Sequence, residues 1–180
     1  MSAKIVWIFG PSAVGKETFI RYVKNNQSPA LLARLGWLEK QIVVCQESLD
    51  WVVQADDDGN ELRRQDLSKI IEAYAQSNRE AVIVIKGQDL DLDYDTLNKT
   101  KKLLINDEHE IIFLSVDFDT LYQRYKTKKW WRKTMTKEVC RDWAKEQIKA
   151  LMEHEGLGFK ITALDSSSDQ YLETTFPPLL

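Results

Sequence analysis

The segment Gly10-Pro11-Ser12-Ala13-Val14-Gly15-Lys16-Glu17-Thr18 decides the fold of this protein. It fits the first seven positions of the pattern G-x-x-x-x-G-K-[ST]. An apolar run at 4–9 precedes it, and a stretch with helical periodicity follows it. Glycines let such a loop turn several backbone N–H groups inward, the following helix adds the positive end of its dipole, and Lys16 supplies a mobile cation. The order of strand, loop and helix therefore predicts a site for a polyphosphate.

One position of the loop departs from the pattern. Glu17 stands where the pattern requires the hydroxyl that binds Mg²⁺, and Thr18 follows one residue later. The alternative interpretation of the whole segment is a glycine-containing turn with a surface lysine. We favour the phosphate-binding interpretation because the flanking strand and helix are the context that the pattern requires.

The rest of the chain alternates short apolar runs with longer, charged stretches of helical pattern, as buried parallel strands and crossover helices do. The strands are expected at 4–9, 41–45, 81–85, 110–116 and 159–164, and the helices at 16–24, 65–76, 96–104, 120–129 and 137–155. This order predicts one α/β domain over 1–180, a three-layer sandwich with a mostly parallel sheet of about five strands and helices on both faces. Two stretches interrupt the alternation, and we interpret 46–64 as an acceptor-binding insertion and 124–136 as a lid.

The loop resembles those of known kinases. Gly10-Pro11-Ser12 with Val14-Gly15-Lys16 is similar to the loop of guanylate kinases, and the threonine two residues after Lys16 is similar to adenylate and deoxynucleotide kinases. Length and element order resemble the wider nucleoside-monophosphate-kinase-like group of P-loop phosphotransferases, which includes shikimate kinases. The resemblance implies a P-loop NTPase fold with ATP and Mg²⁺ as cofactors. It also implies that Thr18 binds the metal while Glu17 points outward.

In the resembling kinases the second strand commonly ends in a carboxylate that orients or deprotonates the acceptor hydroxyl. Here Glu47 and Asp50 follow that strand, so they are the acceptor-side candidates. Such a base helps an alcohol acceptor, whereas a phosphate acceptor is already ionised. The alternative is a pair of solvated loop acids. Arg63 and Arg64 would clamp an anionic acceptor, or else are exposed charges at a helix start.

The third strand is followed by Lys86, Gly87 and two polar residues, Gln88 and Asp89. Gly87 would permit close backbone approach, and the two polar residues would meet the acceptor or a metal-bound water. The alternative is a polar turn in which an aspartate, Asp93 or Asp95, caps the next helix. A lysine at this strand end has no explanation in the sequence.

A basic, aromatic stretch follows the fourth strand: Arg124, Lys126, Lys128, Lys129, Arg132 and Lys133, with Trp130 and Trp131. The resemblance implies arginines that close over the transferring phosphoryl group, and Arg124 fits that position best. Positive charge there would stabilise the equatorial oxygens in transfer. The alternatives are a solvated basic face and a nucleic-acid patch in which tryptophans stack on bases.

Composition limits the class of protein further. Lys and Arg number 25 against 28 Asp and Glu, a net charge of −3, which argues against nucleic-acid binding by bulk electrostatics. No apolar run approaches the roughly 20 residues that span a bilayer, so we expect no membrane partner and a cytoplasmic protein. Cys45 and Cys140 are expected to be free thiols at least partly buried, and the acidic run 56–60 a solvated turn.

The sequence thus predicts an ATP-dependent phosphotransferase that moves the γ-phosphoryl group to a small-molecule acceptor, with a nucleotide or nucleoside favoured. Lys16 and Arg124 would stabilise the transferring group, and Glu47 or Asp50 would lie near the acceptor. The alternative is an NTP-binding regulatory module with slow hydrolysis that docks a protein or RNA partner.

Overall fold

The computed structural model describes residues 2–45, 67–87, 90–128, 136–153 and 158–175. Each strand is followed by one or two helices along this part of the chain, up to the last strand. In chain order they are β1 (Lys4–Phe9), α1 (Lys16–Lys24), α2 (Pro29–Leu35), β2 (Ile42–Val44), α3 (Leu67–Ser77), β3 (Val82–Lys86), α4 (Leu90–Leu103), β4 (Glu108–Ser115), α5 (Phe118–Lys126), α6 (Lys137–Glu153) and β5 (Lys160–Asp165).

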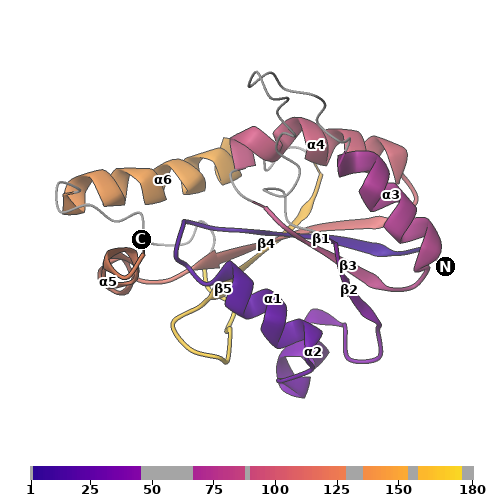
Figure 1. The fold of residues 1–180 in the computed structure, drawn as a ribbon, viewed down its shortest axis with the longest axis horizontal. Coiled ribbons are helices and arrows are strands. Elements are labelled where there is room, and N and C mark those ends of the chain that lie inside the picture. The colour runs from indigo at the N-terminus through magenta and orange to yellow at the C-terminus, as the bar shows by residue number, and fades with distance from the viewer. Residues whose placement is uncertain (1, 46–66, 88–89, 129–135, 154–157, 176–180) are drawn as a thin grey trace, which may run out of the picture.

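The five strands form one sheet in the order β2-β3-β1-β4-β5, and every pairing is parallel. Helices α1 and α2 lie on one face of the sheet, and α3, α4 and α6 lie on the other (Figure 1). The predicted three-layer α/β sandwich is therefore confirmed. Because all strands run the same way, their carboxyl ends gather at one edge, where ligands bind in sheets of this kind.

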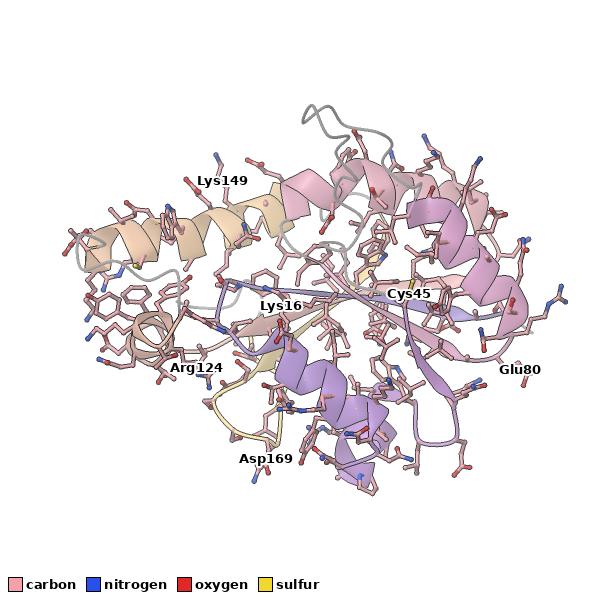
Figure 2. The ribbon with its side chains drawn as sticks, in the orientation of Figure 1. Lys16, Cys45, Glu80, Arg124, Lys149 and Asp169 are labelled. Atoms are coloured by element: carbon pink, nitrogen blue, oxygen red, sulfur yellow. The ribbon has the colours of Figure 1, made fainter. Side chains whose placement is uncertain are left out.

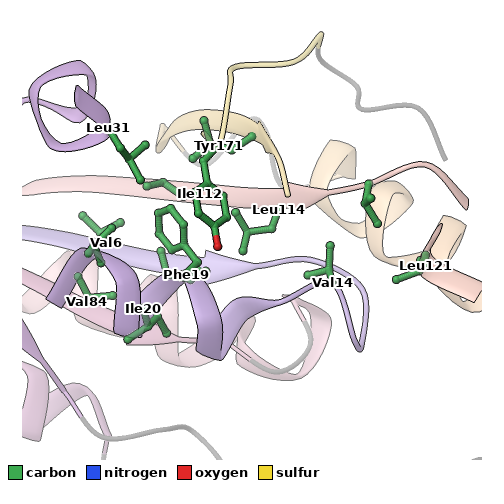
Figure 3. Close-up of a cluster of buried hydrophobic side chains, with 14 of the residues drawn as sticks. Val6, Val14, Phe19, Ile20, Leu31, Val84, Ile112, Leu114, Leu121 and Tyr171 are labelled. Carbon is green, nitrogen blue, oxygen red and sulfur yellow. The ribbon is translucent and has the colours of Figure 1, made fainter. Parts of the chain in front are cut away.

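Strand β1 is the centre of the sheet and of the core. Its residues 5–9 have no exposed surface at all. Val6 and Ile8 pack in one hydrophobic cluster with Phe19 and Ile20 of α1, shown in part in Figure 3, and Trp7 packs in a second cluster on the opposite face. Burying one such side chain contributes about 1.5–3 kcal/mol. The segment that carries the phosphate-binding pattern thus follows a fully buried run of the central strand.

Two helices differ from the sequence prediction. Helix α2 was not predicted, although Ser28 caps it by accepting a hydrogen bond from the Leu31 amide (3.2 Å), Pro29 is its first residue and Gly36 ends it with φ +70°. Helix α4 begins at Leu90 rather than at residue 96. The aspartates expected to cap this helix, Asp93 and Asp95, therefore lie inside it, and that interpretation is wrong.

Two further expectations from the sequence concern the cysteines and membrane-spanning helices. Cys45 and Cys140 are both buried and neither forms a disulfide, as predicted. Within the described residues, no helix combines the length and the apolar character needed to cross a membrane.

A buried carboxylate stabilises the edge of the sheet opposite the loop. Glu110 on β4 is 1% exposed, and its carboxylate pairs with Lys4 Nζ (2.7 Å) and Lys160 Nζ (3.3 Å) and accepts a hydrogen bond from the Thr162 hydroxyl (2.7 Å). These partners offset the cost of burying the charge.

Removing the Glu110 carboxylate should destabilise the fold. We expect Glu110→Ala to lower the free energy of unfolding by about 1–3 kcal/mol, because Thr162 and Lys4 lose their partner beside buried strands. Glu108→Ala is the control, since Glu108 is 74% exposed and 3.8 Å from Lys4, and should change stability by less than about 0.5 kcal/mol. Urea unfolding measures both, and equal losses would contradict the prediction.

Candidate active site

The loop between β1 and α1 has the backbone of a phosphate-binding loop. Gly10, Ala13 and Gly15 adopt positive φ angles of 137°, 63° and 107°. Gly10 cannot carry a side chain, because a Cβ atom there would lie 2.3 Å from the Leu114 carbonyl oxygen. Val14 is fully buried and anchors the loop in the core (Figure 3), and α1 begins directly afterwards at Lys16. Such a turn followed by a helix N-terminus suits an anion.

The Lys16 side chain lies over this loop. Its Nζ donates hydrogen bonds to the carbonyl oxygens of Gly10 (2.6 Å) and Pro11 (3.2 Å). Figure 2 shows Lys16 at the loop end of α1 and Arg124 on α5, both at the carboxyl edge of the sheet. The predicted phosphate-binding lysine is thus held by the loop itself, at the place where an anion would sit.

A cleft of about 660 Å³ opens above the loop. Its walls come from four places: the loop and the first turn of α1, the end of β3, the end of α5, and the segment after β5. The lining residues are Ser12, Ala13, Val14, Gly15, Lys16, Glu17, Thr18, Lys86, Gly87, Arg124, Thr127, Lys128, Ser166 and Tyr171. A volume of this size accommodates a nucleotide-sized ligand.

Lys86, which the sequence left unexplained, is the ion-pair partner of Glu17. Lys86 Nζ lies 2.6 Å from Glu17 Oε1, and the lysine side chain is only 11% exposed, against 74% for the glutamate. The hydrogen bond from Lys86 lowers the pKa of the Glu17 carboxyl below its ordinary value, so this carboxyl is charged at neutral pH. Glu17 was expected to point away from the site, but its carboxylate lines the cleft.

Thr18 also faces the cleft, with an exposed side chain. The first turn of α1 therefore presents both Glu17 and Thr18 to the cleft. A hydroxyl and a carboxylate are both oxygen ligands that Mg²⁺ accepts. The residues at this turn fit a metal ion, and the assignment of the ligand to Thr18 stays a prediction.

Gly87 permits a close approach, as predicted, but its neighbour is an aromatic ring. A Cβ atom at Gly87 would lie 2.1 Å from Phe9 Cε1. Phe9 is fully buried at the end of β1, and the Gly87 amide donates to the carbonyl oxygen of Ile8 (2.9 Å). Gly87 thus lets β3 and the residue after it pack against β1, which places Lys86 beside the loop.

Arg124 is bound to protein oxygens at the wall of the cleft. Its guanidinium donates to the carbonyl oxygens of Val14 (2.9 Å) and Ser166 (2.9 Å), and lies 3.5 Å from the Ser166 hydroxyl. These bonds join α5, the loop and the segment after β5. Its predicted contact with the transferring phosphoryl group stays a prediction.

Two cleft residues were not predicted. Ser166 is buried, and its hydroxyl contacts the carbonyl oxygens of Val14 (2.8 Å) and Ser115 (3.1 Å). Tyr171, also buried, packs edge-on against Phe19 of α1 (4.9 Å between ring centroids), visible in Figure 3. No local pattern marks either residue, because each is defined by a partner more than 100 residues away.

Several predicted residues lie outside the described part of the chain. These are Glu47, Asp50, Arg63 and Arg64 with the whole insertion 46–64, Gln88 and Asp89, and the lid residues Lys129, Trp130, Trp131, Arg132 and Lys133. Of the lid 124–136, residues 124–128 and 136 are described, and Lys128 lines the cleft.

Arg124 should hold the loop in its binding conformation. We expect Arg124→Ala to weaken binding of a non-hydrolysable ATP analogue by about tenfold or more, because Val14 and Ser166 lose charge-assisted hydrogen bonds. Arg124→Lys should not restore affinity, since one ammonium cannot replace the guanidinium fork. Lys126→Ala is the control, because Lys126 contacts Gln123 and Tyr122 away from the cleft. Calorimetric titration measures the affinities, and unchanged binding in Arg124→Ala would reject this role.

Solved structures of similar fold come from several bacteria. A structure from the PezAT chromosomal toxin–antitoxin system of Streptococcus pneumoniae aligns with a TM-score of 0.55 at 14% identity, over 97% of this chain and 70% of that one. A candidate kinase from Chloroflexus aurantiacus aligns with a TM-score of 0.54 at 13% identity, over 95% of this chain and 89% of that one. The tunicamycin resistance protein of Deinococcus radiodurans aligns with a TM-score of 0.52 at 11% identity, over 88% of this chain and 97% of that one.

Neither a protein-family model nor a curated protein matches the sequence. The structural similarity covers 88–97% of this chain. The protein has the P-loop kinase-like fold.

Proposed function

We propose that this protein is an ATP-dependent phosphotransferase that acts on a small-molecule acceptor. The observation that carries the proposal is the convergence of Lys16, Lys86 and Arg124 on one cleft above a loop built for phosphate. Phosphoryl transfer needs positioning and positive charge around the equatorial oxygens more than it needs covalent chemistry. This cleft offers both.

Each described residue has a defined task in this proposal. The loop amides and the N-terminus of α1 hold the polyphosphate, and Lys16 exchanges the Gly10 carbonyl for phosphate oxygens. When bound, Mg²⁺ neutralises phosphate charge, and the first turn of α1, with Thr18 and Glu17, would hold it. Arg124 and Ser166 keep Val14 in place. Glu47 and Asp50 remain the proposed acceptor-side carboxylates.

Acceptor-dependent release of ADP tests the function. The protein is incubated with Mg·ATP and, one at a time, nucleoside monophosphates, nucleosides and sugar acids. ADP formed only with an acceptor supports a phosphotransferase. Slow hydrolysis that no acceptor accelerates, together with tight NTP binding, would instead support an NTP-binding module that docks a protein or RNA.

The metal ligand can be tested by removing Mg²⁺. We expect Thr18→Ala to weaken Mg²⁺-dependent binding of the ATP analogue by about tenfold or more, since even indirect metal contacts contribute this much. In EDTA the variant and the wild type should bind equally, because the hydroxyl acts through the metal. Thr18→Ser keeps the hydroxyl and is the control. If Glu17→Ala abolishes the Mg²⁺ dependence and Thr18→Ala does not, the metal ligand is Glu17.

A further inference from the structure

A second cavity of about 300 Å³ lies beside the phosphate cleft. Ile20 of α1 and Val44 at the end of β2 form its apolar part, and Arg21, Lys24 and Asn25 form its rim. Glu17 and Lys86 line both cavities, so their ion pair stands at the boundary between the two. The second cavity therefore opens directly beside the place where the outer phosphates of a nucleotide would lie.

The described residues of this cavity carry mainly positive charge. Among them, three cations line it, Arg21, Lys24 and Lys86, against the single carboxylate of Glu17. Lys86 is bound to that carboxylate, whereas Arg21 and Lys24 form no ion pair with any residue in the described part of the chain. The two rim cations stand three residues apart on α1, so they face the same side of the helix. Two cations over an apolar floor are arranged to bind an anionic group.

We infer that this cavity is the acceptor subsite and that the acceptor carries an anionic group, a phosphate monoester or a carboxylate. The inference rests on the proposed phosphotransferase function and narrows its substrate class. Arg21 and Lys24 bind the anionic group, and the apolar surface of Ile20 and Val44 contacts the body of the acceptor. Lys86, at the boundary, is a positioning residue that keeps the acceptor and the phosphates of the nucleotide next to each other.

Glu17 also influences which acceptors bind at this boundary, through its ion pair with Lys86. Its carboxylate repels anions, and its side chain is largely exposed, so it can separate from Lys86 when a bound anion attracts the lysine. In the empty protein the ion pair orients the buried lysine. A neutral acceptor would not attract Lys86 away from Glu17.

Binding of inorganic phosphate tests the subsite without any catalysis. The phosphate loop of the full chain is first saturated with the non-hydrolysable ATP analogue and Mg²⁺, and phosphate is then titrated while backbone amide NMR signals are recorded. We expect saturable shifts at Arg21, Lys24 and Lys86. The double variant Arg21→Gln/Lys24→Gln should weaken phosphate binding at least tenfold. Arg79→Gln, which removes an exposed arginine at the far end of the sheet, should leave it unchanged.

The outcomes separate the subsite from the proposed function. Shifts spread over all basic surfaces, or equal in the double variant and the wild type, would overturn the subsite. Acetate titrated in place of phosphate distinguishes a carboxylate-binding site from a phosphate-binding one. ADP release is then compared for matched pairs such as ribose and ribose 5-phosphate, or a nucleoside and its 5′-monophosphate. Faster turnover of the neutral members would overturn the acceptor class, whereas phosphate binding without any ADP release would reject the phosphotransferase and keep the anion site.

Discussion

Lys16→Ala should fold like the wild type and turn over substrate about 10²- to 10³-fold more slowly, the effect of removing one preorganised electrostatic stabiliser. The Lys16 side chain extends over the loop toward the carbonyl oxygens of Gly10 and Pro11 and is not part of either hydrophobic cluster. Its loss should therefore leave the free energy of unfolding nearly unchanged. Steady-state ADP release and urea unfolding measure the two quantities.

A matched substitution separates the site from a general effect of charge. Lys149 on α6 has a side chain that is 76% exposed and does not line the cleft, so Lys149→Ala should turn over normally. Near-normal turnover of Lys16→Ala would reject the assignment of the loop.

Gly10→Ala should destabilise the protein and abolish nucleotide binding. A φ of 137° lies in a region open almost only to glycine, and the added Cβ would lie 2.3 Å from a backbone oxygen of β4 that cannot rotate away. Backbone strain and overpacking together should cost about 2–6 kcal/mol of unfolding free energy. Thermal unfolding and titration with the ATP analogue measure both effects.

Gly36→Ala isolates the contribution of the clash. Gly36 also has a positive φ of 70°, but a Cβ there meets no atom within 4 Å. This control should lose only about 1–2 kcal/mol, the cost of the left-handed conformation, and should bind nucleotide normally. Equal stability losses in the two variants would show that the contact with Leu114 does not contribute to the loss of unfolding free energy.

The sequence predicted the phosphate loop and its flanking elements because their signals are local. Apolar runs, a glycine-containing pattern and helical periodicity lie within 21 consecutive residues, 4–24. The parallel sheet, though not the order of its strands, followed from the succession of strands and helices. Helix α2 also had local signals, a serine cap followed by a proline and a closing glycine, and could have been found from them.

The contacts that complete the cleft could not be predicted in this way. Glu17 and Lys86 are 69 residues apart, and Val14 and Ser166 are 152 residues apart. Each pair is brought together by strand order, which a single sequence does not specify residue by residue. Glu17 and Lys86 each stand out as unusual in the sequence. Only the folded sheet shows that they form an ion pair with each other.

The hydrogen bond between Ser166 and Val14 also limits how early the site can be completed while the chain is being synthesised. A ribosome that adds about 5–20 residues per second needs roughly 8 to 30 s to travel the 152 residues between these two positions. During this interval the nascent chain holds a phosphate loop that lacks one of its supports. We expect ATP to bind such a nascent chain only weakly. Nucleotide would then stabilise the protein only after β5 had joined the sheet.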